Sequence, residues 1–72
     1  PEELEAFLLD LLRRKVLTAI QAKVVLETDI RRGMDVYKWA TRERMGKDVA
    51  HYHRRRAFEA IRSYLMGEGG PA

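Results

Sequence analysis

The chain has 72 residues, of which 35% are charged, with no cysteine and a formal net charge of +3. This length fits one small helical domain, and the lack of cysteine excludes disulfides and thiolate metal sites. No apolar run is long enough to cross a membrane, and the acidic N-terminus is unlike a signal peptide. We therefore expect a cytoplasmic protein without membrane contact. The absence of asparagine and the single glutamine favour a thermophilic source.

Residues 1–15 are predicted to form the first helix. Glutamates in its first turn and basic residues in its last turn complement the helix dipole. Apolar side chains recur along one side at helical spacing, and their arc is wide enough to contact a partner as well as the core. This helix is therefore the candidate surface for a homodimer, through Leu4, Phe7, Leu8 and Leu11.

A second helix is expected to begin at Thr18. The residues from Thr18 to Gln21 match a capping box, in which the Thr18 hydroxyl accepts from the Gln21 backbone N–H and the Gln21 side chain reaches back. The helix is expected to end at Gly33, which tolerates the left-handed conformation that often follows a helix. Its apolar residues are Ile20, Val24 or Val25, Leu26 and Ile30.

Two further helices follow. Asp35 is the N-cap candidate for a short helix over about residues 36–45, and Gly46 interrupts the helical pattern. Residues 47–48 are then expected to form a turn and cap before a final helix that starts near Asp48 and runs to about residue 66. The apolar side of this final helix is expected to consist of Ala50, Ala57, Ile61, Tyr64 and Leu65.

These elements predict an all-α fold, with a four-helix domain over residues 1–66 and a flexible tail over residues 67–72. No stretch has the alternating pattern of a strand. The last two helices, over about residues 35–66, have the lengths and the linking turn of a helix-turn-helix. The first two helices would support that motif.

Charge is unevenly distributed along the chain. Residues 1–30 hold six acidic and four basic side chains, whereas residues 31–56 hold nine basic and three acidic ones. A basic block of this kind indicates binding of a polyanion. A solvated surface of mixed sign is the simpler alternative, and the segregation of the charges argues against it.

About two-thirds of the chain, from Leu17 to Leu65, also carries a series of short matches to one family. These are Leu17-Thr18, Gly33, Ala40, Arg56-Ala57-Phe58, Ile61-Arg62 and Tyr64-Leu65. With these residues the stretch 17–65 resembles the fourth conserved region of bacterial sigma factors and the related LuxR-type DNA-binding domains. The resemblance implies a helix-turn-helix that binds DNA and acts in transcription. It departs from the family pattern at Trp39, where a smaller aliphatic residue is usual, and at Gly46, which lies later than the expected turn.

The candidate DNA-binding residues follow from the helical wheel of the final helix. Side chains at its exposed N-terminal end would reach base edges in a major groove of double-stranded DNA, and these are Lys47, His51, Tyr52 and Arg55. Other basic residues of the last two helices would hold phosphates, and these are Lys38, Arg42, Arg44, Arg54 and Arg56.

Other chemistries find little support. His51 and His53 diverge if they lie on a helix, so they do not form a metal pair. No phosphate-binding glycine loop, activated nucleophile or paired carboxylates are recognisable, so neither an enzyme nor a cofactor is expected. The alternative function is a helical protein-interaction module that docks RNA polymerase or another partner without binding DNA. A second alternative is an RNA- or phage-related protein that uses the arginine run without sequence preference.

Overall fold

The computed structural model describes residues 2–31 and 33–67. Over these residues the chain is helical and contains no strand, which confirms the predicted all-α class. The elements are α1 (Glu2–Arg13), α2 (Ala19–Val25), the π-helical segment η1 (Leu26–Ile30), α3 (Val36–Arg42) and α4 (Lys47–Leu65). Of the tail predicted over residues 67–72, all but residue 67 lies outside the described residues. In the described ranges, no helix has both the length and the apolar character that crossing a membrane requires.

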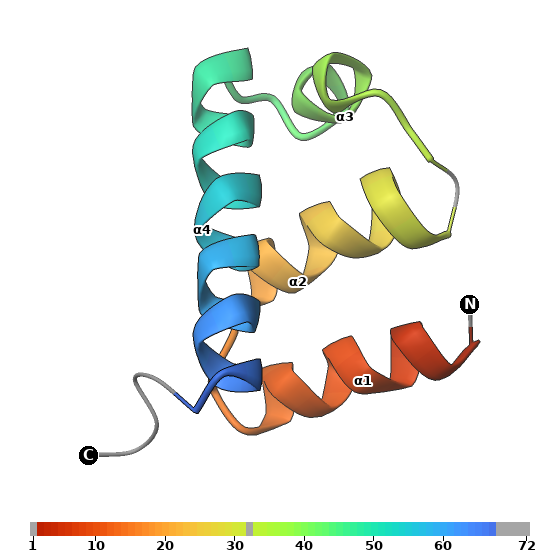
Figure 1. Ribbon diagram of the computed structural model, residues 1–72. Helices are drawn as coiled ribbons and strands as arrows, with labels where there is room; N and C mark the ends of the chain where they lie inside the picture. Colours follow the sequence, from red (N-terminus) through yellow and green to blue (C-terminus); the bar gives the residue numbers. More distant parts are fainter. Residues whose placement is uncertain (1, 32, 68–72) are drawn as a thin grey trace.

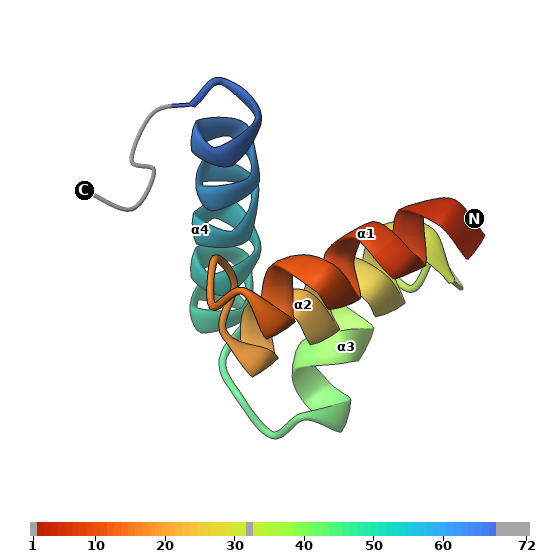
Figure 2. The same ribbon diagram turned by 90° about the horizontal axis from the view of Figure 1, so that it is seen from below.

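The other helices are arranged along α4. Figure 1 shows α1 beside α2 and η1, with α4 passing across the ends of α1 and α2. The short helix α3 lies at the N-terminal end of α4 and crosses it, and α1 lies near the C-terminal end (Figures 1 and 2). The N-terminal half of α4 therefore faces α3 and α2, and its C-terminal half faces α1.

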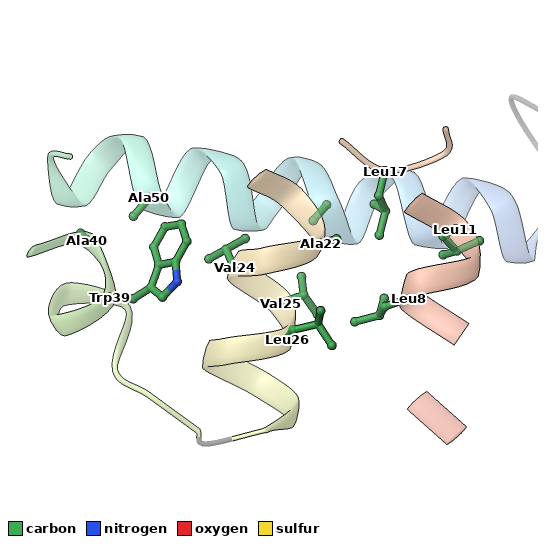
Figure 3. Close-up of a cluster of buried hydrophobic side chains, with 11 residues drawn as sticks. Leu8, Leu11, Leu17, Ala22, Val24, Val25, Leu26, Trp39, Ala40 and Ala50 are labelled. Atoms are coloured by element: carbon green, nitrogen blue, oxygen red, sulfur yellow. The ribbon is translucent and has the colours of Figure 1, made fainter. Parts of the chain in front are cut away.

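The core lies where these helices meet and combines a few large side chains with several alanines. Trp39, Leu11, Leu17 and Val24 are fully buried, and Figure 3 shows Trp39 beside Val24 and Ala50. Small residues let the helix backbones approach closely. The large Trp39 indole fills the space that is left between them, as the close packing of protein interiors requires. The alanines buried in this core are Ala22, Ala40, Ala50 and Ala57.

Local sequence signals set three of the helix ends as predicted. The capping box of α2 is complete, with hydrogen bonds from the Gln21 N–H to the Thr18 hydroxyl at 3.3 Å and from the Thr18 N–H to Gln21 Oε1 at 3.0 Å. Asp35 caps α3 by accepting from the Tyr37 N–H at 2.8 Å. Gly33 follows η1 in the left-handed region, with φ of 60°. Each of these signals acts over a few residues, independently of the tertiary fold.

Other boundaries differ from the predictions. Helix α1 ends at Arg13 and not at Lys15, which adopts a left-handed φ of 63° and turns the chain. The predicted short helix to about residue 45 ends at Arg42. Residues 47–48 form no separate turn and cap, because α4 begins at Lys47 with Gly46 as an N-cap that offers no side-chain hydrogen bond.

Two further differences concern packing. The second predicted helix changes from α to π geometry over η1, and the buried Thr28 donates its hydroxyl to the Val24 carbonyl at 2.7 Å. Leu65 and Tyr64 were expected on the apolar side of the last helix, but they are 65% and 38% exposed. The last turn of α4 extends beyond the rest of the core, so its apolar side is only partly covered there, through the contact of Tyr64 with Phe7 of α1.

Candidate nucleic-acid interface

The two helices predicted to form the interface are joined by a tight turn between Arg42 and Lys47. The turn is closed by backbone hydrogen bonds from the Arg44 N–H to the Thr41 carbonyl at 3.2 Å and from the Met45 N–H to the Ala40 carbonyl at 3.0 Å. Arg44 takes a left-handed φ of 59°, a conformation that is unfavourable for a residue with a Cβ. The turn thus places the start of α4 next to α3.

The π-helical segment η1 holds α3 through Glu27. The Glu27 carboxylate accepts a hydrogen bond from the Trp39 indole Nε1 at 2.8 Å and a second one from the Arg42 guanidinium. Arg42 also pairs with Glu43 at 3.0 Å, and Glu43 pairs with Lys23 of α2 at 2.9 Å. This network joins η1, α2 and the end of α3.

The same segment holds α4 through Asp29. Its two carboxylate oxygens accept from Arg54 Nε at 3.0 Å and from Arg54 Nη2 at 2.7 Å, a bidentate arrangement. Thr28 lies between Glu27 and Asp29 and is buried. Its hydroxyl is also 2.9 Å from an Asp29 oxygen. One short segment therefore connects to both helices of the candidate interface.

The pKa values of these carboxyl groups reflect their partners. Burial acts to raise the pKa of Glu27, but the Trp39 and Arg42 hydrogen bonds outweigh it and the pKa is lowered. Burial likewise acts against ionisation of Asp29, and hydrogen bonds from Arg54 and Thr28 lower its pKa overall. Both carboxyl groups are consequently ionised at neutral pH and hold their arginines as charged pairs.

Three of the candidate phosphate-binding arginines are thus engaged within the chain. Arg42 contacts Glu27 and Glu43, and Arg54 contacts Asp29. Arg56 pairs with a carboxylate one turn along its own helix, at 3.1 Å. The charge pattern of the sequence does not distinguish such arginines from free ones, because two of the partners are distant along the chain.

Four other candidate cations have no carboxylate within ion-pair distance in the ranges 2–31 and 33–67. All four are exposed and lie on α3, in the turn and on the first three turns of α4. They are Lys38, Arg44, Lys47 and Arg55. His51 and Tyr52 are exposed on the same helix, as predicted. These six side chains form the free part of the candidate interface.

Tyr37 joins this group although the sequence analysis gave it no role in binding. It is 53% exposed, its ring contacts the His51 ring edge-on at a centroid distance of 5.5 Å, and Lys47 Nζ lies 5.5 Å from the Tyr37 ring centroid. These contacts connect α3 to the start of α4 on the surface. No spacing rule links Tyr37 to residues ten and fourteen positions later across a turn, so sequence reasoning had no signal for this cluster.

A shallow depression of about 440 Å³ continues the basic surface along α4. Its lining residues are His51, Arg54, Arg55, Phe58, Glu59 and Arg62. Within the described ranges, no group of three histidine, cysteine, aspartate or glutamate side chains is placed to hold a metal ion.

The row of apolar residues proposed for a dimer through the first helix is largely used by the chain itself. Leu8 and Leu11 are 3% and 0% exposed and belong to the core. Phe7 packs against the core and lies 6.4 Å from the Tyr64 ring. Leu4 is 57% exposed, so it is the residue of the row that is open to a partner.

Comparison of the chain with models of protein families, with curated proteins and with solved structures found no match.

Proposed function

We propose that this chain binds double-stranded DNA, with α3 and α4 acting as a helix-turn-helix and the first two turns of α4 entering the major groove. The observation that carries the proposal is a group of exposed cations on α3, the turn and α4 that have no ion-pair partner among the residues that the structure describes. These are Lys38, Arg44, Lys47 and Arg55. The carboxylates of Glu27, Glu43 and Asp29 are bound to other basic residues and do not neutralise this group. Asp48, next to Lys47, offsets one of its charges.

Two features of α4 support the assignment of roles. Its N-terminal end carries the positive end of the helix dipole and has no side-chain cap, which favours an approaching phosphate, while the exposed Asp48 in the same turn offsets part of this charge. His51, Tyr52 and Arg55 project from the next turns and carry donors or acceptors that can reach base edges. The resemblance of residues 17–65 to the sigma-factor and LuxR-type domains points to the same function, in transcription.

Binding to random and defined duplexes, measured by fluorescence anisotropy at several salt concentrations, tests the proposal. We expect binding at low salt that weakens steeply as salt is added, because phosphate contacts release counterions. Absence of any binding at low salt would overturn the proposal. Equal affinity for all duplexes would leave only non-specific binding.

Matched variants separate the roles of the cations. Lys38→Ala should weaken binding to all duplexes alike and lower the salt slope by about 1. Arg55→Ala should in addition reduce discrimination between duplexes, by about 1–3 kcal/mol if it reads a base. Arg13→Ala removes the same charge from an exposed position on α1 and serves as the control. Arg42 is unsuitable for this comparison because its removal breaks the Glu27 network.

A protein-interaction module is the second candidate. The observation that favours it is the exposure of large apolar side chains away from the α3–α4 turn, namely Leu4, Leu9, Leu65 and Met66. Large apolar side chains mark contacts with another protein when they form a patch, and Leu65 and Met66 are adjacent at the end of α4. Docking to RNA polymerase would belong to this class, and it would leave duplex binding absent in the same titration.

A further inference from the structure

The surface of α4 carries a depression that is lined by residues of this helix, with Phe58 as its large apolar side chain and arginines beside it. Phe58 is 41% exposed there, and Arg54 Cζ lies 4.9 Å from its ring centroid. Arg55 and Arg62 line the same depression, and neither forms an ion pair with the residues that the structure describes. Of its lining residues Glu59 is the acidic one, and it is already paired within its own helix. The depression therefore suits a ligand that is both acidic and apolar.

The first turn of α1 has that chemistry. Leu4 lies in the same apolar row as Leu8 and Leu11, yet it is 57% exposed, because the core covers the later turns and leaves the first turn open. Glu2 and Glu3 directly precede it, are exposed, and have no basic partner within the described ranges. The exposed leucine with its two carboxylates is therefore complementary in charge and in apolar character to Phe58 with Arg55 and Arg62.

The two features cannot meet within one molecule. Figures 1 and 2 place the start of α1 at the end of that helix far from α4, with the packed helices between. A contact between them therefore requires a second molecule. Because the two surfaces differ, such a contact is heterologous, and it repeats from copy to copy as an open chain or a closed ring.

We propose that the depression on α4 binds the first turn of α1 from a second copy of this chain. Leu4 of one copy packs on Phe58 of the next, while Glu2 and Glu3 face Arg55 and Arg62. The contact is small, so the association is weak and reversible. It also weakens as salt is added, because its charged groups are exposed. The proposal is independent of DNA, although Arg55 belongs to both surfaces.

Sedimentation equilibrium without DNA, over a wide range of protein concentrations, tests this contact. The first variant, Leu4→Ser with Glu3→Gln, removes the inserted turn. The second, Phe58→Ser with Arg62→Glu, removes the depression. All four residues are exposed, and circular dichroism checks that both variants stay helical. The wild-type protein should show a mass that rises with concentration and falls with salt, and each variant alone should associate at least about tenfold more weakly, the loss expected for a central contact.

Mixing the two variants gives the decisive result. Each variant retains the surface that the other has lost, so an equimolar mixture should form a one-to-one complex and no larger species. A wild-type protein that stays monomeric at all concentrations would overturn the proposal and leave an acidic segment of another protein as the alternative occupant. A wild-type dimer that the variants do not disrupt would also overturn it, as would disrupted association that mixing does not restore.

Discussion

Arg54 of α4 binds Asp29 of η1 through two hydrogen bonds, at 2.7 and 3.0 Å, across 25 positions of sequence. Both side chains are about one third exposed, at 35% and 28%. This pair fixes the middle of α4 to the π-helical segment, while Glu27 of the same segment fixes α3 through Trp39 and Arg42. Two carboxylates that lie two residues apart thus tie η1 to both α3 and α4, in addition to the packing of the buried core.

Replacing Asp29 with asparagine tests how much this pair contributes. Asp29→Asn should lower the free energy of unfolding by about 0.5–1 kcal/mol, since a partly exposed bidentate pair lies at the upper end of surface ion pairs. In DNA binding the released Arg54 should add a phosphate contact and raise the salt slope by about 1. Urea denaturation and duplex titration at several salt concentrations measure the two effects.

Asp10→Asn is the matched control, because Asp10 pairs with Arg14 one turn away on α1. That exposed pair should contribute only about 0.3–0.5 kcal/mol and should not affect duplex binding. An unchanged salt slope in Asp29→Asn would show that Arg54 is not positioned to reach phosphate.

Acid should destabilise the fold through its paired carboxylates. The Arg31 hydrogen bond lowers the pKa of Glu5, and the Lys23 hydrogen bond lowers that of Glu43. The pKa values of Glu27 and Asp29 are also lowered. A carboxyl group whose pKa is lowered in the folded state stabilises the fold at pH values above its ordinary pKa, which is 4.5 for glutamate and 3.8 for aspartate. This stabilisation is lost as the pH falls through the lower pKa of the folded state.

Unfolding free energies measured from neutral pH down to strong acid should therefore be level near neutrality and fall below about pH 4.5. The double variant Glu27→Gln with Asp29→Asn should start less stable and show a shallower fall. A double variant as acid-sensitive as the wild type would assign the fall to other groups.

The turn between α3 and α4 offers a variant in which stability and binding should change in opposite directions. Arg44 holds a left-handed φ of 59°, which costs a non-glycine residue about 1–2 kcal/mol. Glycine removes that cost, but it also raises the conformational entropy of the unfolded chain, which lowers stability by about 0.4–1 kcal/mol. Arg44→Gly should therefore raise the unfolding free energy by about 0.5–1 kcal/mol while weakening duplex binding. Thermal unfolding and duplex titration measure the two.

Lys15→Gly provides the comparison. Lys15 has a φ of 63° in the turn after α1, far from the candidate interface. We expect the same gain in stability and no change in affinity for DNA. Equal losses of affinity in both variants would mean that net charge, and not the position of Arg44, governs binding.

The close approach of α4 to the other helices depends on small residues. Ala57 is fully buried, so Ala57→Leu inserts three carbon atoms into filled space and should cost about 1–3 kcal/mol. Ala6→Leu makes the same change at an exposed helical position of α1 and should stay within about 0.5 kcal/mol of the wild type. Chemical denaturation of the two variants gives the comparison, and equal stabilities would contradict the packing described for α4.

Prediction from sequence succeeded where structure is determined within a few residues. The capping box at Thr18, the cap at Asp35 and the left-handed Gly33 depend on short-range hydrogen bonds and backbone sterics, and hydrophobic spacing identified the helices themselves. The π geometry of η1 was missed because its apolar residues continue the pattern of an ordinary helix. The turn at Lys15 was missed because lysine carries no signal for a left-handed backbone.

The candidate site was harder to predict than the fold. Counting charges identified the basic block, and the wheel of the last helix placed His51, Tyr52 and Arg55 at the surface, where they lie. Neither method could distinguish Arg42 and Arg54 from the free cations, because their partners lie 15 and 25 positions away in sequence. Which side chain pairs with which is a property of the packed helices, so it becomes visible only in three dimensions.

Trp39 is the single tryptophan of the chain, and it is fully buried with its indole N–H bonded to Glu27. Indole emission shifts to longer wavelength when water reaches the ring. The protein consequently carries its own optical reporter for the seating of α3. A ligand that binds on the exposed side of α4 without disturbing the core should leave that emission unchanged, whereas one that lifts α3 from η1 should shift it to the red.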